Sequence, residues 1–150
     1  MTVCTTCELI AARDAGTAPP WDRIIRTEHW DIVHAHPTSL LGWLCLVLRR
    51  HVEAIDELTE AEADELGPLL RNLSRFLRAD RECTKTYVMQ FAEHPQHPHV
   101  HFHVVPRMPD LPIENVGPNV FNYLGVEDDA RIDDAAMNDL ADRMRPLTGR

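Results

Sequence analysis

Four histidines alternate with apolar residues in the second half of the sequence, and this alternation constrains the fold more than any other feature. The histidines are His97, His99, His101 and His103, and the residues that follow them are Pro98, Val100, Phe102 and Val104. In a β-strand, side chains two positions apart lie on the same face, about 6.6 Å from one another, whereas a helix would scatter them around its axis. The pattern therefore predicts a strand over residues 99–105 whose imidazoles share one surface.

The apolar residues of this strand are expected to face the core. We assign Val100, Phe102, Val104 and also Val105 to the buried side. Pro106 is expected to end the strand, because a proline cannot donate a ladder hydrogen bond.

Imidazoles that gather on one surface can form a solvated polar face by chance, bind a metal, or act on a phosphorus atom. A catalytic metal site needs further ligands, but the next acidic residue, Asp110, lies beyond the strand in an expected loop. A neutral imidazole is a good nucleophile that can split one displacement into two, and neighbouring groups can hold the phosphoryl oxygens. The residues favour phosphoryl chemistry and leave the other two interpretations open.

The rest of the chain predicts an α+β fold with a five-stranded antiparallel sheet. The expected strands span residues 23–27, 30–34, 42–48, 86–90 and 99–105. A capping box at Thr59 and Glu62 begins a long amphipathic helix that ends near Ala79, and Gly67-Pro68 should kink or split this helix. Helical turns are expected at residues 8–13 and 120–124, and a final helix at 133–144.

Length and charge limit the class of protein. A chain of 150 residues predicts a single domain over residues 1–150, in which residues 106–150 form a C-terminal loop and helix. The formal net charge of −9 argues against binding a nucleic-acid polymer. The N-terminus lacks the features of a signal peptide, and no apolar run is long enough to span a bilayer. We expect a cytoplasmic protein without membrane contact, whose four cysteines stay reduced.

The segment His99-Val-His-Phe-His-Val-Val105 resembles the signature of the histidine triad (HIT) family, His-φ-His-φ-His-φ-φ with φ apolar, at all seven positions. The resemblance implies a HIT-like five-stranded antiparallel sheet with a long helix on one side and a C-terminal helix, usually within a homodimer. It also implies that His101 attacks the α-phosphorus of a nucleotide, that His103 binds a phosphate oxygen, and that His99 completes the catalytic set.

The activity that this resemblance implies is that of a nucleotide hydrolase. Such an enzyme splits dinucleoside polyphosphates or nucleoside phosphoramidates to a nucleoside monophosphate, through a covalent nucleotidyl group on His101. Two alternatives remain open. One is a nucleotidyltransferase or phosphorylase, which passes the nucleotide to a second phosphate, and the other is a nucleotide-binding zinc protein without turnover.

Cys4 and Cys7 resemble the Cys-x-x-Cys of a small zinc-bearing branch of the family. In that branch a histidine before the long helix, here His51, and the first triad histidine, here His99, complete the site. Residues 1–15 would then form a zinc-binding N-terminal segment, and a structural Zn²⁺ with four protein ligands would join it to the triad strand. The alternative is a pair of free thiols, with His51 on the surface.

The segment before the triad departs from the family pattern. Gln90, Gln96 and His97 are therefore the candidates for the substrate contacts that the family makes there. Arg107 either complements phosphate charge or caps the end of the strand.

Two further departures concern the first half of the chain. His34 and His36 lie near the position of the family's ribose-binding acid, which falls at Ala35, and they either replace it or are exposed on an edge strand. Leu41-Gly42-Trp43 stands in place of the family's Pro-Gly-His, and the three tryptophans are expected to serve packing more than base stacking.

Overall fold

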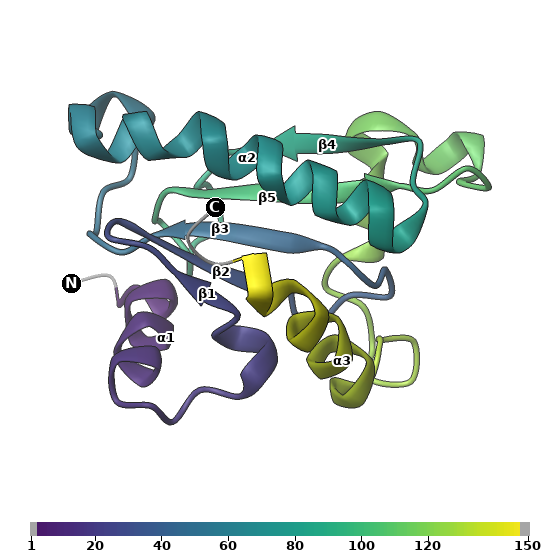
Figure 1. The fold of residues 1–150 in the computed structure, drawn as a ribbon, viewed down its shortest axis with the longest axis horizontal. Coiled ribbons are helices and arrows are strands. Elements are labelled where there is room, and N and C mark those ends of the chain that lie inside the picture. The colour runs from purple at the N-terminus through teal and green to yellow at the C-terminus, as the bar shows by residue number, and fades with distance from the viewer. Residues whose placement is uncertain (1–2, 148–150) are drawn as a thin grey trace.

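A computed structural model describes residues 3–147, which form a five-stranded antiparallel sheet with helices on both faces (Figure 1). The strand order is β1-β2-β3-β5-β4, so β3 and β5 lie inside the sheet and β4 lies at one edge. The strands are β1 (Ile25–Arg26), β2 (Trp30–His34), β3 (Leu44–Leu48), β4 (Lys85–Met89) and β5 (His101–Arg107). The predicted α+β class and antiparallel sheet are confirmed.

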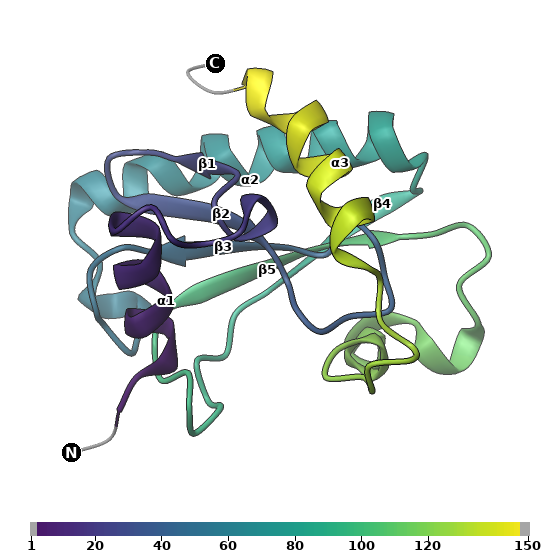
Figure 2. The same cartoon turned by 90° about the horizontal axis from the view of Figure 1, so that it is seen from below.

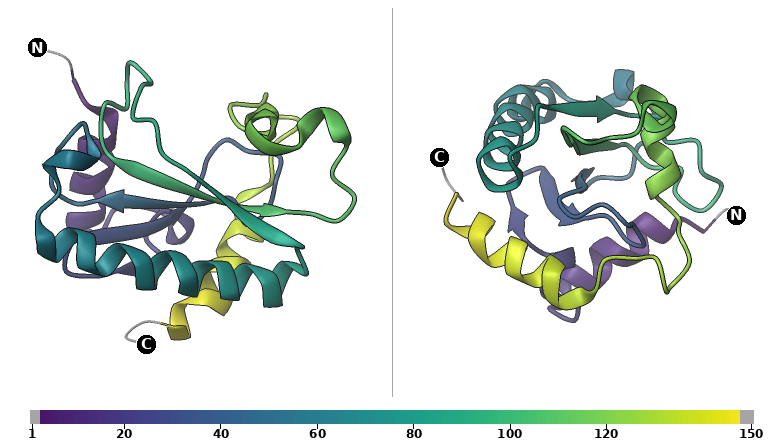
Figure 3. Two further views of the ribbon diagram at one scale, coloured as in Figure 1. Left: turned by 90° about the horizontal axis from the view of Figure 1, so that it is seen from above. Right: turned by 90° about the vertical axis from the view of Figure 1, so that its right-hand side faces the viewer.

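The two faces of the sheet carry different coverings. Helices α2 (Glu60–Arg81) and α3 (Asp134–Met144) pack on one face, which we call the helix face. Helix α1 (Thr5–Asp14) and the short helix η4 (Gly117–Tyr123) lie on the opposite face, which we call the cavity face (Figures 2 and 3). No described helix is both long and apolar enough to cross a membrane.

The alternation divides residues 100–104 between these two faces, as expected, although β5 begins at His101 and not at His99 as predicted. Val100, Phe102 and Val104 pack in the core under α2 and α3. The assignment of Val105 to the same side is wrong, because this residue packs on the cavity face. The two-residue period of a strand places position 105 with positions 101 and 103.

The expected end of the strand at Pro106 is also wrong. Strand β5 continues to Arg107, and Pro106 pairs with Thr86 of β4. On its other side β5 pairs with β3 only as far as Val104, which lies opposite Leu44. The missing N–H of Pro106 therefore removes no bond to β3, whose pairing has already ended.

Helix α2 is one continuous helix of 22 residues, so of the two expected effects of Gly67-Pro68 the split is wrong, and the kink stays a prediction. Its N-terminus has the predicted capping box, in which Oγ1 of Thr59 accepts from the Glu62 amide and the Glu62 carboxylate accepts from the Thr59 amide. Pro68 removes one backbone hydrogen bond. The apolar stripe of α2 packs along the core of the helix face, and this packing stabilises the helix despite the missing hydrogen bond.

Three further elements differ from their predicted bounds. Helix α1 has ten residues and begins directly after Cys4, whereas a short turn over residues 8–13 was expected. Strand β1 is reduced to two residues. Strand β3 begins at Leu44 because the preceding Gly42 has a φ of +94° and sits in a turn.

Candidate active site

A cavity of about 800 Å³ opens on the cavity face of the sheet. Its floor crosses three neighbouring strands, with Val33 from β2, Cys45 and Val47 from β3, and His101 and His103 from β5. Its walls come from α1, the short helix η1 (Pro20–Asp22), residues 91–97 and η4. Two of the triad histidines therefore line this cavity.

His101 presents a free lone pair to the cavity. Its Nδ1 lies 2.7 Å from the backbone oxygen of His99, and a carbonyl can only accept, so Nδ1 carries the proton. The neutral ring then has its lone pair on Nε2. Burial lowers the pKa of His101, against the opposing effect of the His99 carbonyl, and so favours this neutral form.

His103 holds the opposite tautomer. The indole Nε1 of Trp43, which can only donate, lies 3.0 Å from Nδ1 of His103. The proton of the neutral His103 ring must therefore be on Nε2, which makes this atom a donor. Burial first, and then the charge of His101, lower the pKa of His103 to about 3, so that it stays neutral.

The two rings lie close together at the same end of the cavity. Their centroids are 4.9 Å apart and the rings are nearly perpendicular. Phe121 of η4 packs edge-on against His103 at 5.1 Å and against Trp43 at 5.4 Å. The arrangement places a nucleophilic nitrogen beside a hydrogen-bond donor under an aromatic wall, which is a suitable geometry for attack on a phosphoryl group.

His99 does not line the cavity, although it precedes His101 by only two residues. Its ring is fully buried, and Nε2 donates to the backbone oxygen of Leu48 at 2.6 Å. The lone pair on Nδ1 therefore points away from Leu48, toward Cys4 and Cys7.

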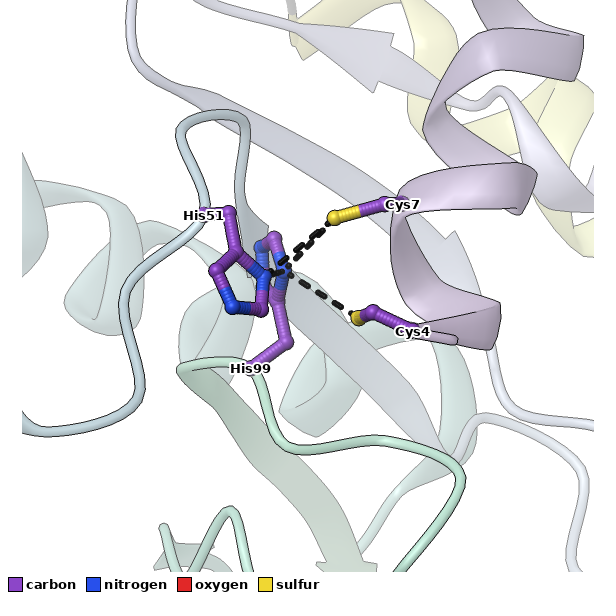
Figure 4. A group of neighbouring side chains, drawn as sticks. All are labelled: Cys4, Cys7, His51 and His99. Carbon is purple, nitrogen blue, oxygen red and sulfur yellow. Dashed lines mark hydrogen bonds between the residues drawn. The ribbon is translucent and has the colours of Figure 1, made fainter. Parts of the chain in front are cut away.

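Cys4, Cys7, His51 and His99 form a compact cluster beside the start of β5 (Figure 4). One ligand atom from each lies within 4.8 Å of all the others. The Nδ1 atoms of His51 and His99 are 3.1 Å apart, and Sγ of Cys7 lies 3.3 and 3.6 Å from them. Tetrahedral zinc with ordinary bond lengths has N···N and N···S separations of about 3.4 and 3.6 Å. The four donors fit such an ion in type and in spacing.

The segment before β5 is attached to the first turn of α1. The Thr5 amide donates to the backbone oxygen of Gln96 at 2.8 Å, and Oγ1 of Thr6 is 2.9 Å from Nδ1 of His97. Gln96 and His97 both line the cavity. Because Thr6 lies between Cys4 and Cys7, the metal cluster and this wall of the cavity share one turn of helix.

The other predicted substrate contacts lie elsewhere. Gln90 does not line the cavity, and its Nε2 is buried without a partner in the described chain. Arg107 also lies outside the cavity lining, at the far end of β5, where its guanidinium donates to the backbone oxygen of Met108 at 2.8 Å. This contact matches the second of the two alternatives for Arg107, in which it caps the end of the strand.

His34 is neither exposed nor available as a ligand. It is buried, its Nδ1 donates to the Ala35 oxygen at 2.7 Å, and its Nε2 accepts from the Gly42 amide at 3.0 Å. Burial lowers the pKa of His34 to about 4. His36 is exposed and stacks on Trp21, with centroids 4.9 Å apart.

Sequence reasoning missed several cavity residues. Asp22 and Arg13 form a buried ion pair at one side of the cavity, and His94 and Phe91 line another side. Trp43, which does not line the cavity, was expected to serve packing more than base stacking, and its contact with His103 was not foreseen. Arg13, Asp22 and Trp43 come from segments far from the triad in sequence, whereas Phe91 and His94 lie in the segment directly before it, which departs from the family pattern.

The fold has many relatives of known structure. A HIT-like protein involved in cell-cycle regulation from Bartonella henselae, solved with an unknown ligand, has a TM-score of 0.68 at 14% identity, covering 92% of this chain and 93% of its own. A zinc-bound histidine triad family protein from Mycobacterium smegmatis has a TM-score of 0.63 at 14% identity, covering 96% of both chains. A hypothetical histidine triad nucleotide-binding protein from Sulfolobus tokodaii has a TM-score of 0.67 at 13% identity, covering 93% of this chain and 90% of its own.

No curated protein sequence matches the chain. The HIT domain model matches residues 20–110, which include the sheet, α2 and the whole triad. These 91 positions are more than half of the 150 residues. The chain therefore belongs to the HIT domain family.

Proposed function

We propose that this protein is a nucleotide hydrolase in which His101 briefly carries the nucleotide. The observation that carries the proposal is the pair of opposite tautomers in the cavity: a lone pair on Nε2 of His101 beside an N–H on Nε2 of His103. A similar fold in a histidine triad nucleotide-binding protein supports a nucleotide as the ligand.

The reaction proceeds in two displacements. In the first, Nε2 of His101 forms a bond to the α-phosphorus while the bond from phosphorus to the leaving group breaks, and the leaving group departs with the electron pair and takes a proton from solvent. In the second, a water oxygen attacks the phosphorus, the P–N bond breaks, and its electrons return to Nε2 as the water proton passes to solvent. In both steps the N–H of His103 donates to a non-bridging oxygen, whose negative charge grows as the new bond forms.

A fluorogenic adenosine phosphoramidate tests this proposal. The protein is expected to release the fluorophore and AMP, and His101→Ala is expected to reduce the rate at least about a thousandfold, because it removes the nucleophile. His29→Ala changes a histidine outside the cavity lining and should keep the rate. Equal rates for the protein and for His101→Ala would overturn the proposal, and formation of ADP with added phosphate would make the enzyme a phosphorylase.

We further propose that Cys4, Cys7, His51 and His99 hold a structural zinc ion. The donor types and separations support zinc, and a fold relative is zinc-bound. When bound, zinc would link the start of α1 to the entry of β5, and its four protein ligands would leave no position for substrate.

Elemental analysis tests the metal. We expect one zinc ion per chain, and Cys4→Ser should lower both the metal content and the melting temperature more than it lowers the rate. Cys83→Ala changes a buried thiol away from the cluster and should retain the metal. Protein purified without chelators that contains no zinc would overturn this assignment.

We also propose that two copies associate through β4. This five-residue edge strand leaves backbone groups unpaired on its outer side, and Val88 on it is 44% exposed. The opposite edge, β1, has only two residues. Light scattering should give the mass of a dimer, and Val88→Lys should shift it toward the monomer, whereas a monomeric parent protein would contradict the proposal.

A further inference from the structure

The first turn of α1 takes part in two sites at once. Cys4 and Cys7, which belong to the metal cluster, lie three positions apart, so their side chains are neighbours on the helix surface (Figure 4). Thr6, which lies between them, is buried and lines the cavity. The metal cluster and the cavity therefore both depend on the position of this one turn.

The part of the cavity wall that meets this turn is formed by Gln96 and His97. Oγ1 of Thr6 lies 2.9 Å from Nδ1 of His97, and the Thr5 amide donates to the backbone oxygen of Gln96 at 2.8 Å. Thr6 is only 5% exposed. A buried polar group that loses its partner is costly, so the contact between Thr6 and His97 holds both side chains in place.

The same wall is attached at its other end to a residue of the metal cluster. The His99 amide donates to the backbone oxygen of His97 at 2.8 Å. Only Pro98, whose ring restricts φ, lies between these two histidines. Residues 96–99 and the first turn of α1 therefore form a closed ring of contacts, in which the metal cluster is one link and the contact between Thr6 and His97 is another.

The two ends of α1 are fastened differently. Arg13 in the last turn forms ion pairs with Asp22 and Asp31. At the other end, the N-cap residue Cys4 makes no side-chain cap hydrogen bond. A helix end without such a cap is less stable. The orientation of the first turn therefore depends strongly on its contacts with the metal cluster and with the cavity wall.

We propose that Thr6 couples the two sites, so that zinc in the metal cluster and a nucleotide in the cavity strengthen each other's binding. The inference rests on the proposed function and on the proposed zinc site, and it makes Thr6 a positioning residue that acts through His97. The arrangement that brings Cys4 and Cys7 to their partners is also the one in which Thr6 holds His97 in the wall. Coupling between two binding sites is reciprocal, so a nucleotide that contacts this wall favours the same turn.

A zinc-competition titration against a colorimetric chelator, without AMP and with saturating AMP, tests the coupling. AMP is expected to raise the affinity for zinc about fivefold. Thr6→Val keeps the branched shape of the side chain and removes the hydroxyl, so it should reduce this effect to less than about twofold. Thr6→Ser retains the hydroxyl and should keep the full effect. The measured quantity is a metal affinity, which does not depend on turnover.

Thr5→Val is the matched control. It removes a hydroxyl from the neighbouring position of the same turn, but Thr5 contacts Gln96 through its backbone amide, which the substitution retains. This variant should show the full effect of AMP on zinc binding. If AMP acted only by favouring the folded chain, Thr6→Val would keep the effect as Thr5→Val does, and the role of Thr6 would be refuted.

The outcomes separate this inference from the two proposals on which it rests. If the unaltered protein binds both zinc and AMP, and AMP leaves the zinc affinity unchanged, the inference is refuted while the hydrolase and zinc proposals stand. If the protein binds no zinc, the inference fails together with the zinc proposal. If AMP does not bind and the phosphoramidate is not cleaved, it fails together with the hydrolase proposal.

Discussion

Two buried tryptophans, one on each face of the sheet, each donate a hydrogen bond from the indole nitrogen, but to different kinds of acceptor. Trp30 on the helix face donates from Nε1 to the backbone oxygen of Glu62 at 3.0 Å, and so holds α2 onto the sheet. Trp43 on the cavity face donates from Nε1 to Nδ1 of His103, also at 3.0 Å. The contact on the helix face stabilises the fold, whereas the contact on the cavity face sets the tautomer of His103.

The largest effect is expected from a truncation on the helix face. Leu77 of α2 is fully buried, so Leu77→Ala should lower the free energy of unfolding by about 3–4 kcal/mol. The rate per folded molecule should not change, because Leu77 does not line the cavity. Urea unfolding measures the loss, and Ile55→Ala, at a residue that is 47% exposed, should cost less than about 0.5 kcal/mol. A loss of turnover in Leu77→Ala without a loss of stability would contradict the distinction between the helix face and the cavity face.

A smaller effect on stability is expected from the protonation of His34 at low pH. His34 is the last residue of β2 and accepts a hydrogen bond from the Gly42 amide. Its pKa is about 4 in the folded protein and 6.5 ordinarily, so the unfolded chain takes up the proton first as the pH falls. The contribution of neutral His34 to the free energy of unfolding is fully present above pH 6.5 and is lost as the pH falls toward 4. The loss amounts to about 2 kcal/mol at pH 5.

Urea unfolding at pH 7.5 and at pH 5 measures this difference, and His34→Gln should reduce it. The low pKa of His103 contributes with the same sign, so the comparison with the variant isolates His34. An unchanged pH dependence in His34→Gln would show that the buried ring does not titrate as expected.

Trp43→Phe should lower kcat about tenfold at constant KM, because His103 loses the donor that keeps its proton on Nε2. Nitrogen chemical shifts of His103 report the tautomer directly. Trp30→Phe removes an equivalent bond on the other face and should reduce stability while leaving these shifts and kcat unchanged. A His103 tautomer that survives Trp43→Phe would remove the distinction between the two tryptophans.

The smallest expected effect concerns the wall of the cavity. Thr6→Val removes the hydroxyl that contacts Nδ1 of His97 and should raise KM about threefold. Thr6→Ser retains the hydroxyl and should restore the parent KM. Equal values for the two variants would show that the contact does not position His97.

The helix face was largely predictable from the sequence, because its signals are local. The capping box fixed the start of α2, and the alternation along β5 assigned Phe102 and Val104 to the core. The same period places Val105 on the cavity face, so that error came from grouping it with Val104 by its apolar character. Burial on both faces makes hydrophobicity uninformative there.

The cavity face was predictable at the triad, at Gln96 and His97 directly before it, and at the cysteine pair with its partner His51. Asp22 and Trp43 are 79 and 58 residues away from His101 in sequence and belong to no motif. Their contacts depend on which segments the folded chain brings together. The burial of His34 was missed for the same reason, since the Gly42 amide that it accepts from is a feature of the folded turn.

The proton on His101 is fixed by the main-chain oxygen of His99, and every amino acid supplies such an oxygen. No substitution of the side chain at position 99 removes that acceptor. The tautomer of His101 therefore does not depend on which amino acid occupies that position. The cavity-lining residues of η1 and of the segment before β5 can vary while the ring of the proposed nucleophile keeps its tautomer. A departure from the family pattern in those segments therefore leaves the geometry of the proposed nucleophile unchanged.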